Sequence, residues 1–363
     1  MQMRQAKSDN TDARTAVREI ADSLGGPLDA VLFFASSRYD LDALGEALRQ
    51  TFDCTVIGCT SAGQIDCAGF SKGGISALGF SGGHFSLKPH LIHPLGSCVE
   101  RALAIAESLQ DESPGVGRFG LLLIDGLSKS EERVASALYQ ALGKLPFIGA
   151  SASDDLQFVR TCVYYEGAFI SDAAVFTVVT TDLPFSVFKL QHFVPGSRRM
   201  VITHSDTAQR IIHEIDGLPA AEGYAEAIGH DVGELSAALI SHPLLLRIGD
   251  DHFIRSISTV LDDLSLLCFS AIDTGLVVTA GNALDPITAL DNAFAEVRRK
   301  IGEPQVIIGS DCVLRRLEFE QTGMLGDVGA LLAKNKVFGF STYGEQFNAF
   351  HVNQTFTGIA IGQ

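Results

Sequence analysis

The sequence of 363 residues contains no tryptophan and is poor in cationic side chains, with 27 lysines and arginines against 43 aspartates and glutamates. The formal net charge is -16. Non-specific binding to nucleic acid requires cations that neutralise phosphates, and the same negative field repels an anionic membrane surface. The composition therefore argues against a nucleic-acid partner and against a membrane partner. Without tryptophan, uptake of a chromophore has to be followed by absorbance.

Long apolar runs are also missing. No stretch reaches the roughly 18 apolar residues of a membrane-spanning helix, and the first ten residues, "MQMRQAKSDN", lack the apolar segment of a secretion signal. The seven cysteines are scattered, without the spacing of a disulfide framework. We therefore expect a cytoplasmic protein with reduced thiols, long enough for two or three domains.

A threefold repeat is present. Similar glycine-rich turns occur as "VIGCTSAG" (56–63), "FIGASASD" (147–154) and "VFGFSTYG" (337–344). An apolar strand pattern and a helix pattern precede each turn, and another strand pattern follows it. The preceding strands lie at 30–36, 119–126 and 304–311, and the following strands at 74–80, 173–179 and 355–362. Repeats of this kind decide the architecture.

The repeats predict a mixed α/β fold with two domains, in which helices pack on largely parallel and mixed sheets built from strand-helix-strand-strand units. The turns are interpreted chiefly as scaffold, and together they could line one cavity. A catalytic alternative makes Ser61 the nucleophile of a hydrolase. That motif requires a helix after the turn, whereas "QIDCAGFSKGG" is not helical.

Local patterns predict further elements. An N-terminal helix places Ala13, Val17, Ile20 and Leu24 on one face. Ser128 and Glu131 match a capping box at the start of the second repeat's helix. Residues 198–229 predict a short helix followed by a Gly-Leu-Pro break, residues 242–258 and 264–281 predict two hairpins, and residues 286–301 predict a helix. A domain boundary is expected between residues 200 and 222.

Several motifs resemble the FIST family of bacterial sensory proteins. They are "FIGASASDDLQFVRT", "HEIDGLPAAEGYAEAIG", "SDCVLRRLE", "GFSTYGEQF" and "HVNQT", and they span nearly the whole chain. The resemblance implies an N-terminal helix over 1–27, a FIST N-like domain over 28–210 and a FIST C-like domain over 211–363. One departure is Val352, which separates His351 from Asn353, whereas many FIST proteins join histidine directly to Asn-Gln-Thr.

Within that family, "SHPLLLRIG", "IRSIS", "CFSAIDTGLVVTAG" and "DCVLRRLE" are most similar to the nitric-oxide-sensing branch (NosP). This implies a haem b cofactor, nitric oxide as stimulus, and a histidine kinase or a cyclic-di-GMP enzyme as partner, without catalysis by the chain itself. A homo-oligomer is compatible with this role. The alternative is a haem-free FIST sensor that binds a small metabolite such as an amino acid.

The implied haem directs attention to possible iron ligands. Imidazole is the commonest nitrogen ligand of iron, and thiolate is an alternative. His242, which precedes a proline and a strand, and His351, in the third repeat, are the histidine candidates, and Cys312 is the thiolate candidate. The competing interpretation of each is a satisfied core or surface residue. Cys54, Cys59 and Cys67 lack the close pairs of a zinc site.

Four further residues are candidates for holding a cofactor or metabolite. Arg247 and Arg255 interrupt apolar strands, and a guanidinium matches a haem propionate or an amino-acid carboxylate. The competing and favoured interpretation is a solvated strand face or an ion pair with Asp250 or Asp262. Tyr343 and Glu345 follow the third glycine turn, where they serve either as ligand contacts or as anchors of the loop.

Overall fold

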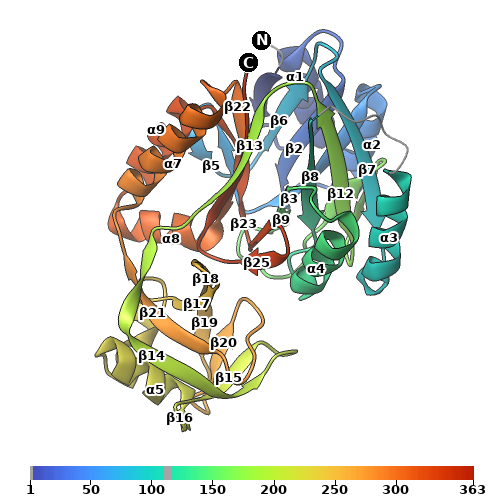
Figure 1. The fold of residues 1–363 in the computed structure, drawn as a ribbon. Helices are drawn as coiled ribbons and strands as arrows, with labels where there is room; N and C mark the ends of the chain where they lie inside the picture. The colour runs from blue at the N-terminus through green and yellow to red at the C-terminus, as the bar shows by residue number, and fades with distance from the viewer. Residues whose placement is uncertain (1–2, 110–116) are drawn as a thin grey trace. The chain divides into compact units, whose positions relative to one another are not determined.

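The structure is a computed structural model that describes residues 3–109 and 117–363. Its mixed α/β architecture confirms the predicted fold class. The chain forms two compact units (Figure 1). The core unit takes the described residues up to 189 together with 290–351 and 356–363, and the inserted unit takes residues 190–289 and 352–355. These units divide the chain at positions other than 27 and 210, and the domain bounds inferred from sequence stay a prediction.

The core unit consists of three repeats, each of which supplies four strands of a six-stranded sheet in the same order. In every sheet, two parallel strands are joined through a helical connection, and an antiparallel strand pairs with the first of them. The strands of the first repeat are β1 (Met3–Ser8), β2 (Ala30–Ser36), β3 (Thr55–Ser61) and β6 (Ile75–Phe80). Those of the second are β7 (Phe85–Ile92), β8 (Gly117–Ile124), β9 (Phe147–Ser151) and β12 (Ala174–Thr181). Those of the third are β13 (Phe185–Leu190), β22 (Val306–Cys312), β23 (Val337–Thr342) and β26 (Phe356–Ile361).

A short hairpin from each repeat completes the sheet of another repeat. The hairpins are β4 (Gln64–Asp66) with β5 (Gly69–Ser71), β10 (Val163–Tyr165) with β11 (Ala168–Ile170), and β24 (Glu345–Phe347) with β25 (Phe350–Val352). Strand β4 pairs with β23, β10 pairs with β3, and β24 pairs with β9. The exchange is therefore cyclic: the first repeat extends the third, the second extends the first, and the third extends the second.

The repeated glycine lies at the same register position in all three sheets. Phe33 pairs with Gly58, Leu122 with Gly149, and Gly309 with Gly339. At each glycine a Cβ atom would collide with atoms of the preceding parallel strand, such as the Gly309 carbonyl oxygen facing Gly339. The glycines are thus explained by close approach of neighbouring strands.

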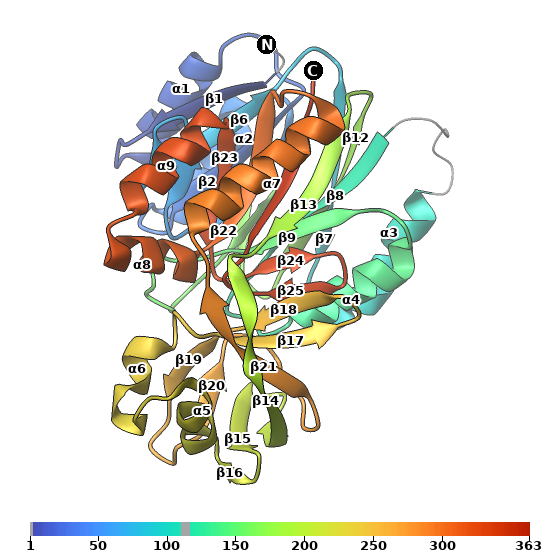
Figure 2. The ribbon, with the colours of Figure 1, turned by 60° about the vertical axis from the view of Figure 1, so that its left-hand side comes forward.

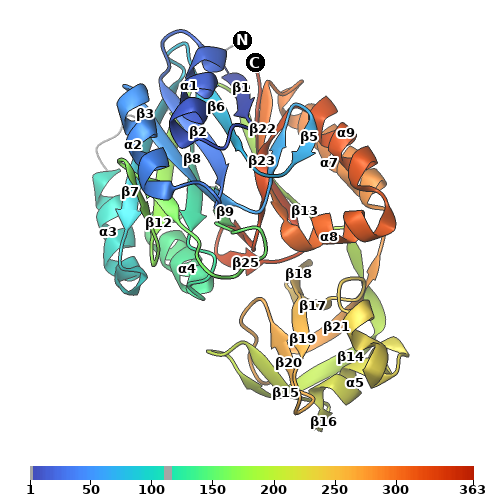
Figure 3. The same cartoon turned by 180° about the vertical axis from the view of Figure 1, so that it is seen from behind.

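Helices cover the outer faces of the three sheets (Figures 1–3). They are α1 (Ala13–Leu24) and α2 (Leu41–Thr51) in the first repeat, the 3₁₀ turn Leu95–Ser97, α3 (Cys98–Ser108) and α4 (Glu131–Leu142) in the second, and α7 (Pro286–Ile301), α8 (Val313–Thr322) and α9 (Leu325–Lys334) in the third. Helix α1 buries the four predicted residues Ala13, Val17, Ile20 and Leu24. The inner faces share one apolar core, in which Phe34 stacks on Phe340 with ring centroids 4.3 Å apart.

The inserted unit lies in the chain between β13 and α7. Its eight-stranded sheet contains β14 (Phe193–Asp206), β15 (Ile211–Ile215), β16 (Leu218–Pro219), β17 (Leu244–Ile248), β18 (Asp251–Arg255), β19 (Ile257–Val260), β20 (Leu266–Cys268) and β21 (Val277–Ala283). Its helices are α5 (Ala220–Ile228), the 3₁₀ turn Val232–Glu234 and α6 (Leu235–Ala238). In the first two repeats the corresponding connection, from β1 to α1 and from β7 to the turn before α3, is only a few residues long.

Three local predictions are wrong. The helix within 198–229 follows the Gly-Leu-Pro break as α5 instead of preceding it, because β14 and β15 occupy the earlier residues. Ser128 does not cap α4: its hydroxyl bonds the Asp125 carbonyl oxygen at 2.8 Å, and Ser130 occupies the cap position. Residues 264–281 do not form a hairpin, because β20 pairs with β15 and β19 while β21 pairs with β14 and β17.

Candidate functional site

The three glycine turns meet at the carboxyl ends of the parallel strands and are joined by hydrogen bonds. The Ala62 amide donates to Ser153 Oγ at 2.7 Å, and Ser153 Oγ donates to the Ser341 carbonyl oxygen at 2.7 Å. The Ser153 amide donates to the Thr60 carbonyl oxygen at 3.1 Å. One serine hydroxyl thus connects all three repeats. This arrangement supports the scaffold interpretation of the turns.

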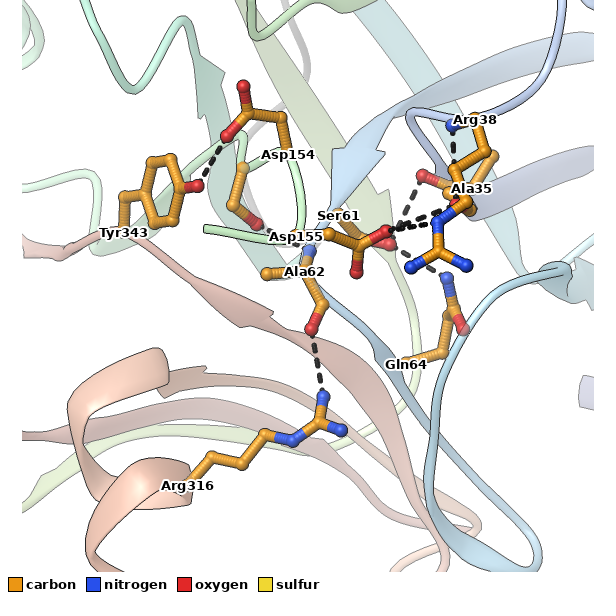
Figure 4. A network of polar contacts seen from close by, with 11 residues as sticks. Ala35, Arg38, Ser61, Ala62, Gln64, Asp154, Asp155, Arg316 and Tyr343 are labelled. Atoms are coloured by element: carbon orange, nitrogen blue, oxygen red, sulfur yellow. Dashed lines mark hydrogen bonds and ion pairs between the residues drawn. The ribbon is translucent and has the colours of Figure 1, made fainter. Parts of the chain in front are cut away.

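Ser61 is not placed as a nucleophile. Its buried hydroxyl donates to the Ala35 carbonyl oxygen at 3.1 Å and accepts from Gln64 Nε2 at 2.8 Å (Figure 4). A serine nucleophile requires a neighbouring base that takes its proton, and neither a carbonyl nor an amide does so. The hydrolase alternative therefore has no support in the geometry of this serine.

Asp154 holds the loop that follows the second turn. Its buried carboxylate accepts backbone N–H groups from Phe158 at 3.0 Å, Val159 at 2.8 Å and Arg160 at 2.9 Å. The Tyr343 hydroxyl donates to the same carboxylate (Figure 4). Burial, followed by the Asp154 carboxylate, raises the pKa of Tyr343 far above its usual range, which keeps the phenol protonated as a donor.

The backbone of this loop is strained. Asp155, Leu156 and Phe158 have φ values of 56°, 63° and 52°, a region that bulky side chains rarely adopt. The Phe158 ring stacks on Tyr343 with centroids 4.7 Å apart, while Leu156 and Val159 are exposed. Such strain persists only where surrounding contacts impose it, and it concentrates at functional sites. The Asp154 carboxylate supplies those contacts here.

Charged side chains tie the first repeat to the other two. Arg38 Nε lies 3.4 Å from Asp155 Oδ2, which also accepts from Ser36 Oγ at 3.3 Å. Lys72 Nζ lies 2.9 Å from Glu320 Oε1 on α8. Burial opposes ionisation of Glu320, but Lys72 and then the Arg316 guanidinium outweigh it and lower the pKa of the carboxyl.

Arg316 forms the second link of this network. Its Nη1 donates to the Ala62 carbonyl oxygen at 2.8 Å (Figure 4). Its Nε donates to Glu320 Oε1 at 3.2 Å. The contact with Glu320 is an i, i+4 ion pair within α8. Arg315 is instead fully buried against Asp311, with Nε 2.5 Å from Oδ1.

A pocket of about 220 Å³ opens beside this network at the carboxyl ends of β1 and β2. In open α/β sheets, ligands bind beyond the carboxyl ends of parallel strands. Three connections of the first repeat line the pocket, and they contribute Asp9, Asn10, Thr11, Ser36, Arg38, Tyr39, Lys72, Gly73 and Gly74.

A larger pocket of about 630 Å³ lies on the sheet of the inserted unit. The pairs Arg199 with Thr279, Leu245 with Thr279, and Arg247 with His252 place these side chains on one face. Strand β14 loses its regular register between Pro195 and Arg199, and the irregular residues form a wall of the pocket. Among the described residues, the buried Thr279 Oγ1 has no hydrogen-bond partner.

The two predicted arginines do not form one clamp. Arg255 pairs with Leu244 and Arg247 with His252, so the two guanidinium groups leave opposite faces of the hairpin. Arg255 is buried, whereas Arg247 is exposed and lies 3.6 Å from Asp250, the predicted ion-pair partner. Only Arg247 lines the larger pocket.

The proposed iron ligands occupy separate places. His242, in the inserted unit, is half-buried, with Nδ1 3.1 Å from the Gly281 carbonyl oxygen. His351, in the core unit, is buried, with Nδ1 3.0 Å from Gln346 Nε2. Cys312 is buried at the end of β22, and none of these three side chains lines either pocket.

Glu345 and Tyr343 belong to the third repeat's turn and hairpin. Glu345 is buried in β24 opposite Ala150 of β9, and Tyr343 anchors the Asp154 loop. Asn353 and Gln354 belong to the inserted unit, where Asn353 Oδ1 accepts from Ser270 Oγ and Gln354 Oε1 accepts from Ser256 Oγ at 2.7 Å. Burial raises the pKa of the Cys59 thiol well above its usual range. Over residues 3–109 and 117–363, no three His, Cys, Asp or Glu side chains are grouped to hold a metal ion.

Sequence reasoning missed the residues that line the smaller pocket. Asp154 and Asp155 were part of a quoted motif, but their carboxylates carry no local signal of a role. The positive φ values of their loop fall on residues other than glycine, so composition does not reveal them. Ser36, Arg38 and Lys72 come from separate connections that only the sheet order brings together.

Fold and pockets define a class of protein: three fused α/β repeats with a second domain inserted into the third. Family models match residues 29–218 as a FIST N domain and residues 220–348 as a FIST C domain. The chain therefore belongs to the FIST family, and it is a sensory signalling protein. No helix in the described parts of the chain is long and apolar enough to cross a membrane.

The uncharacterized protein MJ1623 of Methanocaldococcus jannaschii is 25% identical to the chain over 199 residues, which are 50% of this chain and 38% of that protein. The chain thus matches well under two thirds of that relative's length. Among solved structures, cyanuric acid hydrolase is similar over 99% of both chains with a TM-score of 0.35 and 8% identity. That score is too low to carry an argument about activity.

Proposed function

We propose that the protein senses a small anionic metabolite, which binds in the 630 Å³ pocket of the inserted unit, and that the bound state controls a signalling partner. One observation carries this proposal: Arg199, Arg247 and His252 line the same pocket as Thr279, whose buried hydroxyl has no hydrogen-bond partner within the described chain. A carboxylate fits this set, because a guanidinium provides paired N–H donors and the hydroxyl provides another.

The ion pair already at the site does not block such a ligand. The side chain of Asp250 is fully exposed, and its contact with Arg247 is long at 3.6 Å. A solvent-exposed pair of this kind contributes little, roughly 0–1 kcal/mol. A ligand carboxylate that also bonds Arg199 and Thr279 therefore displaces Asp250 without a large loss.

The test is a thermal-shift titration with the twenty amino acids and with simple carboxylates. We expect the melting temperature to rise with a subset of them, and we expect Arg199→Gln and Arg247→Gln to remove the rise. Arg198→Gln is the matched control, because Arg198 is adjacent but pairs with Glu226 at 3.0 Å outside the pocket. A rise that survives both pocket variants would contradict the proposal.

A second candidate stimulus is nitric oxide bound to haem b, which the sequence resemblance suggests. Of the three candidate ligands, His242 would be the one best prepared to hold the iron, because its Nδ1 already contacts the Gly281 carbonyl oxygen, as the second nitrogen of a metal-bound histidine commonly does. His351 and Cys312 fit less well, because both are buried and Gln346 contacts the His351 ring. Haem, when bound, would supply the iron that takes up the gas.

Absorbance tests the haem candidate. Protein produced with adequate haem should show a Soret band that shifts under nitric oxide. His242→Ala should remove the band, and His351→Ala should keep it if the protein folds. A colourless wild-type protein leaves the metabolite as the stimulus.

The proposed partner is a histidine kinase or a cyclic-di-GMP enzyme. A sensor regulates such a partner only if its ligand binds one conformation better than the other. Kinase autophosphorylation measured with wild-type protein and with Arg247→Gln, each with and without ligand, tests this point. A ligand effect in wild type alone supports the proposal, and equal effects in both proteins contradict it.

A further inference from the structure

The smaller pocket lies beside Ser36 of the first repeat. The equivalent position of the second repeat carries a carboxylate, that of Asp125. The glycine register aligns Ser36 with Asp125, because each lies three residues beyond the residue paired with Gly58 or Gly149. The backbone contacts agree: the Ser36 amide donates to Gly74 O at 2.9 Å, and the Asp125 amide donates to Ala173 O at 2.9 Å.

In the second repeat the Asp125 carboxylate binds two connections together. It accepts the Leu127 amide at 3.1 Å, the Asp172 amide at 2.7 Å and the Thr161 hydroxyl. This is a complete oxyanion site whose anion belongs to the chain.

In the first repeat the residue equivalent to Asp125 is Ser36, which carries no carboxylate. The residues equivalent to Leu127 and Asp172 are Arg38 and Gly73, and both line the pocket. Ser36 Oγ accepts the Arg38 amide at 3.3 Å and donates to Asp155 Oδ2 at 3.3 Å. Arg38 and Lys72 add two positive charges to the lining of the pocket. The residue of the second repeat that is equivalent to Arg38 is the uncharged Leu127.

We propose that the first repeat binds a small oxyanion in this pocket, with its oxygens at the place that the Asp125 carboxylate takes in the second repeat. The volume of about 220 Å³ lies below the roughly 300–1,000 Å³ of pockets for drug-sized ligands, so the ligand is a short carboxylate or a small phosphate ester. Asp9 is the one carboxylate in the lining, and it selects a ligand that also carries a hydroxyl or another donor.

Occupancy changes the links between repeats. The anion competes with Asp155 for Arg38 and with Glu320 for Lys72, contacts of 3.4 and 2.9 Å that join the first repeat to the second and the third. Asp155 belongs to the strained loop held by Asp154. Binding therefore releases one anchor of that loop. This response is separate from ligand binding in the inserted unit.

Calorimetric titration of the full chain tests the proposal with three probes that share one carbon skeleton: glycerate, glycerol 3-phosphate and neutral glycerol. We expect saturable binding of at least one of the two anions, and the tighter one identifies the group as carboxylate or phosphate. Absence of binding by both anions, or equal binding of glycerol, would overturn the proposal.

Matched variants locate the site. Arg38→Gln should weaken binding by about tenfold or more, whereas Arg299→Gln should not, although the exposed fractions of the two arginine side chains, 79% and 76%, are alike and both are ion-paired. Asp155→Asn should strengthen binding, because it removes a competitor for Arg38. Equal effects of Arg38→Gln and Arg299→Gln would refute the assignment.

Ser36→Asp is the most direct variant, since it restores the carboxylate of the second repeat. It should abolish anion binding. Ser36→Asn introduces a side chain of nearly the same size and shape as aspartate but without its charge, and it should retain anion binding. Loss of binding in both would show that bulk, not charge, closes the pocket, and would contradict the proposal. If Ser36→Asp does not fold, Lys72→Gln takes its place and should weaken binding by about tenfold.

Discussion

At the scale of single residues, Asp154 determines the conformation of the loop between the second turn and β10. Its buried carboxylate receives three backbone N–H groups and one phenol. Four donors replace the hydration that burial removes. The strained φ values of Asp155, Leu156 and Phe158 are a consequence, because the three amides converge on one side chain.

The first prediction concerns this carboxylate. Asp154→Ala should lower the free energy of unfolding by roughly 3 kcal/mol, since hydrogen bonds to a charged group contribute about 1.5–3 kcal/mol each and are not additive. Tyr343→Phe removes one of these donors and should cost about 1.5 kcal/mol. Urea denaturation followed by circular dichroism measures both. Asp250→Asn, at an exposed carboxylate, is the control, and an equal loss there would contradict the role of Asp154.

Several site residues were accessible from sequence, and others were not. The Arg316–Glu320 pair follows from i, i+4 spacing on a helix, and Arg247–Asp250 from the hairpin turn. Arg247 and Arg255 looked alike as cations in apolar strands, but strand parity places them on opposite faces. Asp125 and Ser36 show their equivalence only through the register of the sheets.

At the scale of elements, the repeat glycines fix how closely the parallel strands approach. Gly339→Ala should destabilise the protein by roughly 1–3 kcal/mol, because its Cβ would meet the Gly309 carbonyl oxygen and the backbone would have to shift. Gly96→Ala is the matched control, since nothing lies within 4 Å of its added Cβ. Thermal unfolding compares the two. Similar melting temperatures would show that β22 and β23 adjust freely.

Helix α8 is attached to the first repeat through Glu320, and this attachment depends on pH. The folded-state pKa of Glu320 is lowered, so the carboxylate contributes stability above its unfolded pKa of about 4.3 and loses that contribution as the pH falls through the folded value. Glu320→Gln should therefore cost less than about 1 kcal/mol at pH 7. The difference should vanish in acid, where both side chains are neutral. Glu100→Gln, at an exposed residue of α3, is the control, and an equal loss of stability there would contradict the role of Glu320.

Elements with strong periodicity were predicted closely: β2 and α7 have the predicted bounds, and α1 buries the predicted face. Predictions were wrong where the composition of a turn fits either a hairpin or a contact with another strand. Asp273, Thr274 and Gly275 have hairpin composition, yet Thr207 Oγ1 donates to the Asp273 carboxylate at 2.6 Å and the Gly275 amide donates to Ile202 O at 2.8 Å. These contacts with β14 and the residue after it leave β20 and β21 in separate pairings.

At the scale of the whole molecule, three repeats share one core through exchanged hairpins. The sequence showed the repeats, because composition and period recur along the chain. It did not show the exchange, because a hairpin has the same local pattern whichever sheet it joins, and the partner is set by contacts distant in sequence. The apolar core contains residues of all three sheets, among them Phe34 stacked on Phe340, and it therefore holds the three sheets together.

The interruption of the third repeat leads to the last prediction. Asp285 caps α7 by accepting the Thr288 amide at 2.8 Å, as Asp12 caps α1 by accepting the Thr15 amide at 2.8 Å. In the first repeat only three residues separate the last residue of β1 from this aspartate. A variant in which Asp9-Asn10-Thr11 replaces residues 191–284 should therefore retain a cooperatively folded core unit, as judged by circular dichroism and a sharp melting transition.

The control deletes a short segment that pairs with the sheet of another repeat. Replacing residues 163–170 with a short glycine-serine loop removes β10 and β11, which complete the first repeat's sheet and cover β3. This smaller change should abolish cooperative melting, because it leaves the edge of β3 unpaired and breaks the cycle of exchanged hairpins. If the large deletion unfolds the protein while the small one is tolerated, then the inserted unit, and not the exchange of strands, holds the three repeats together.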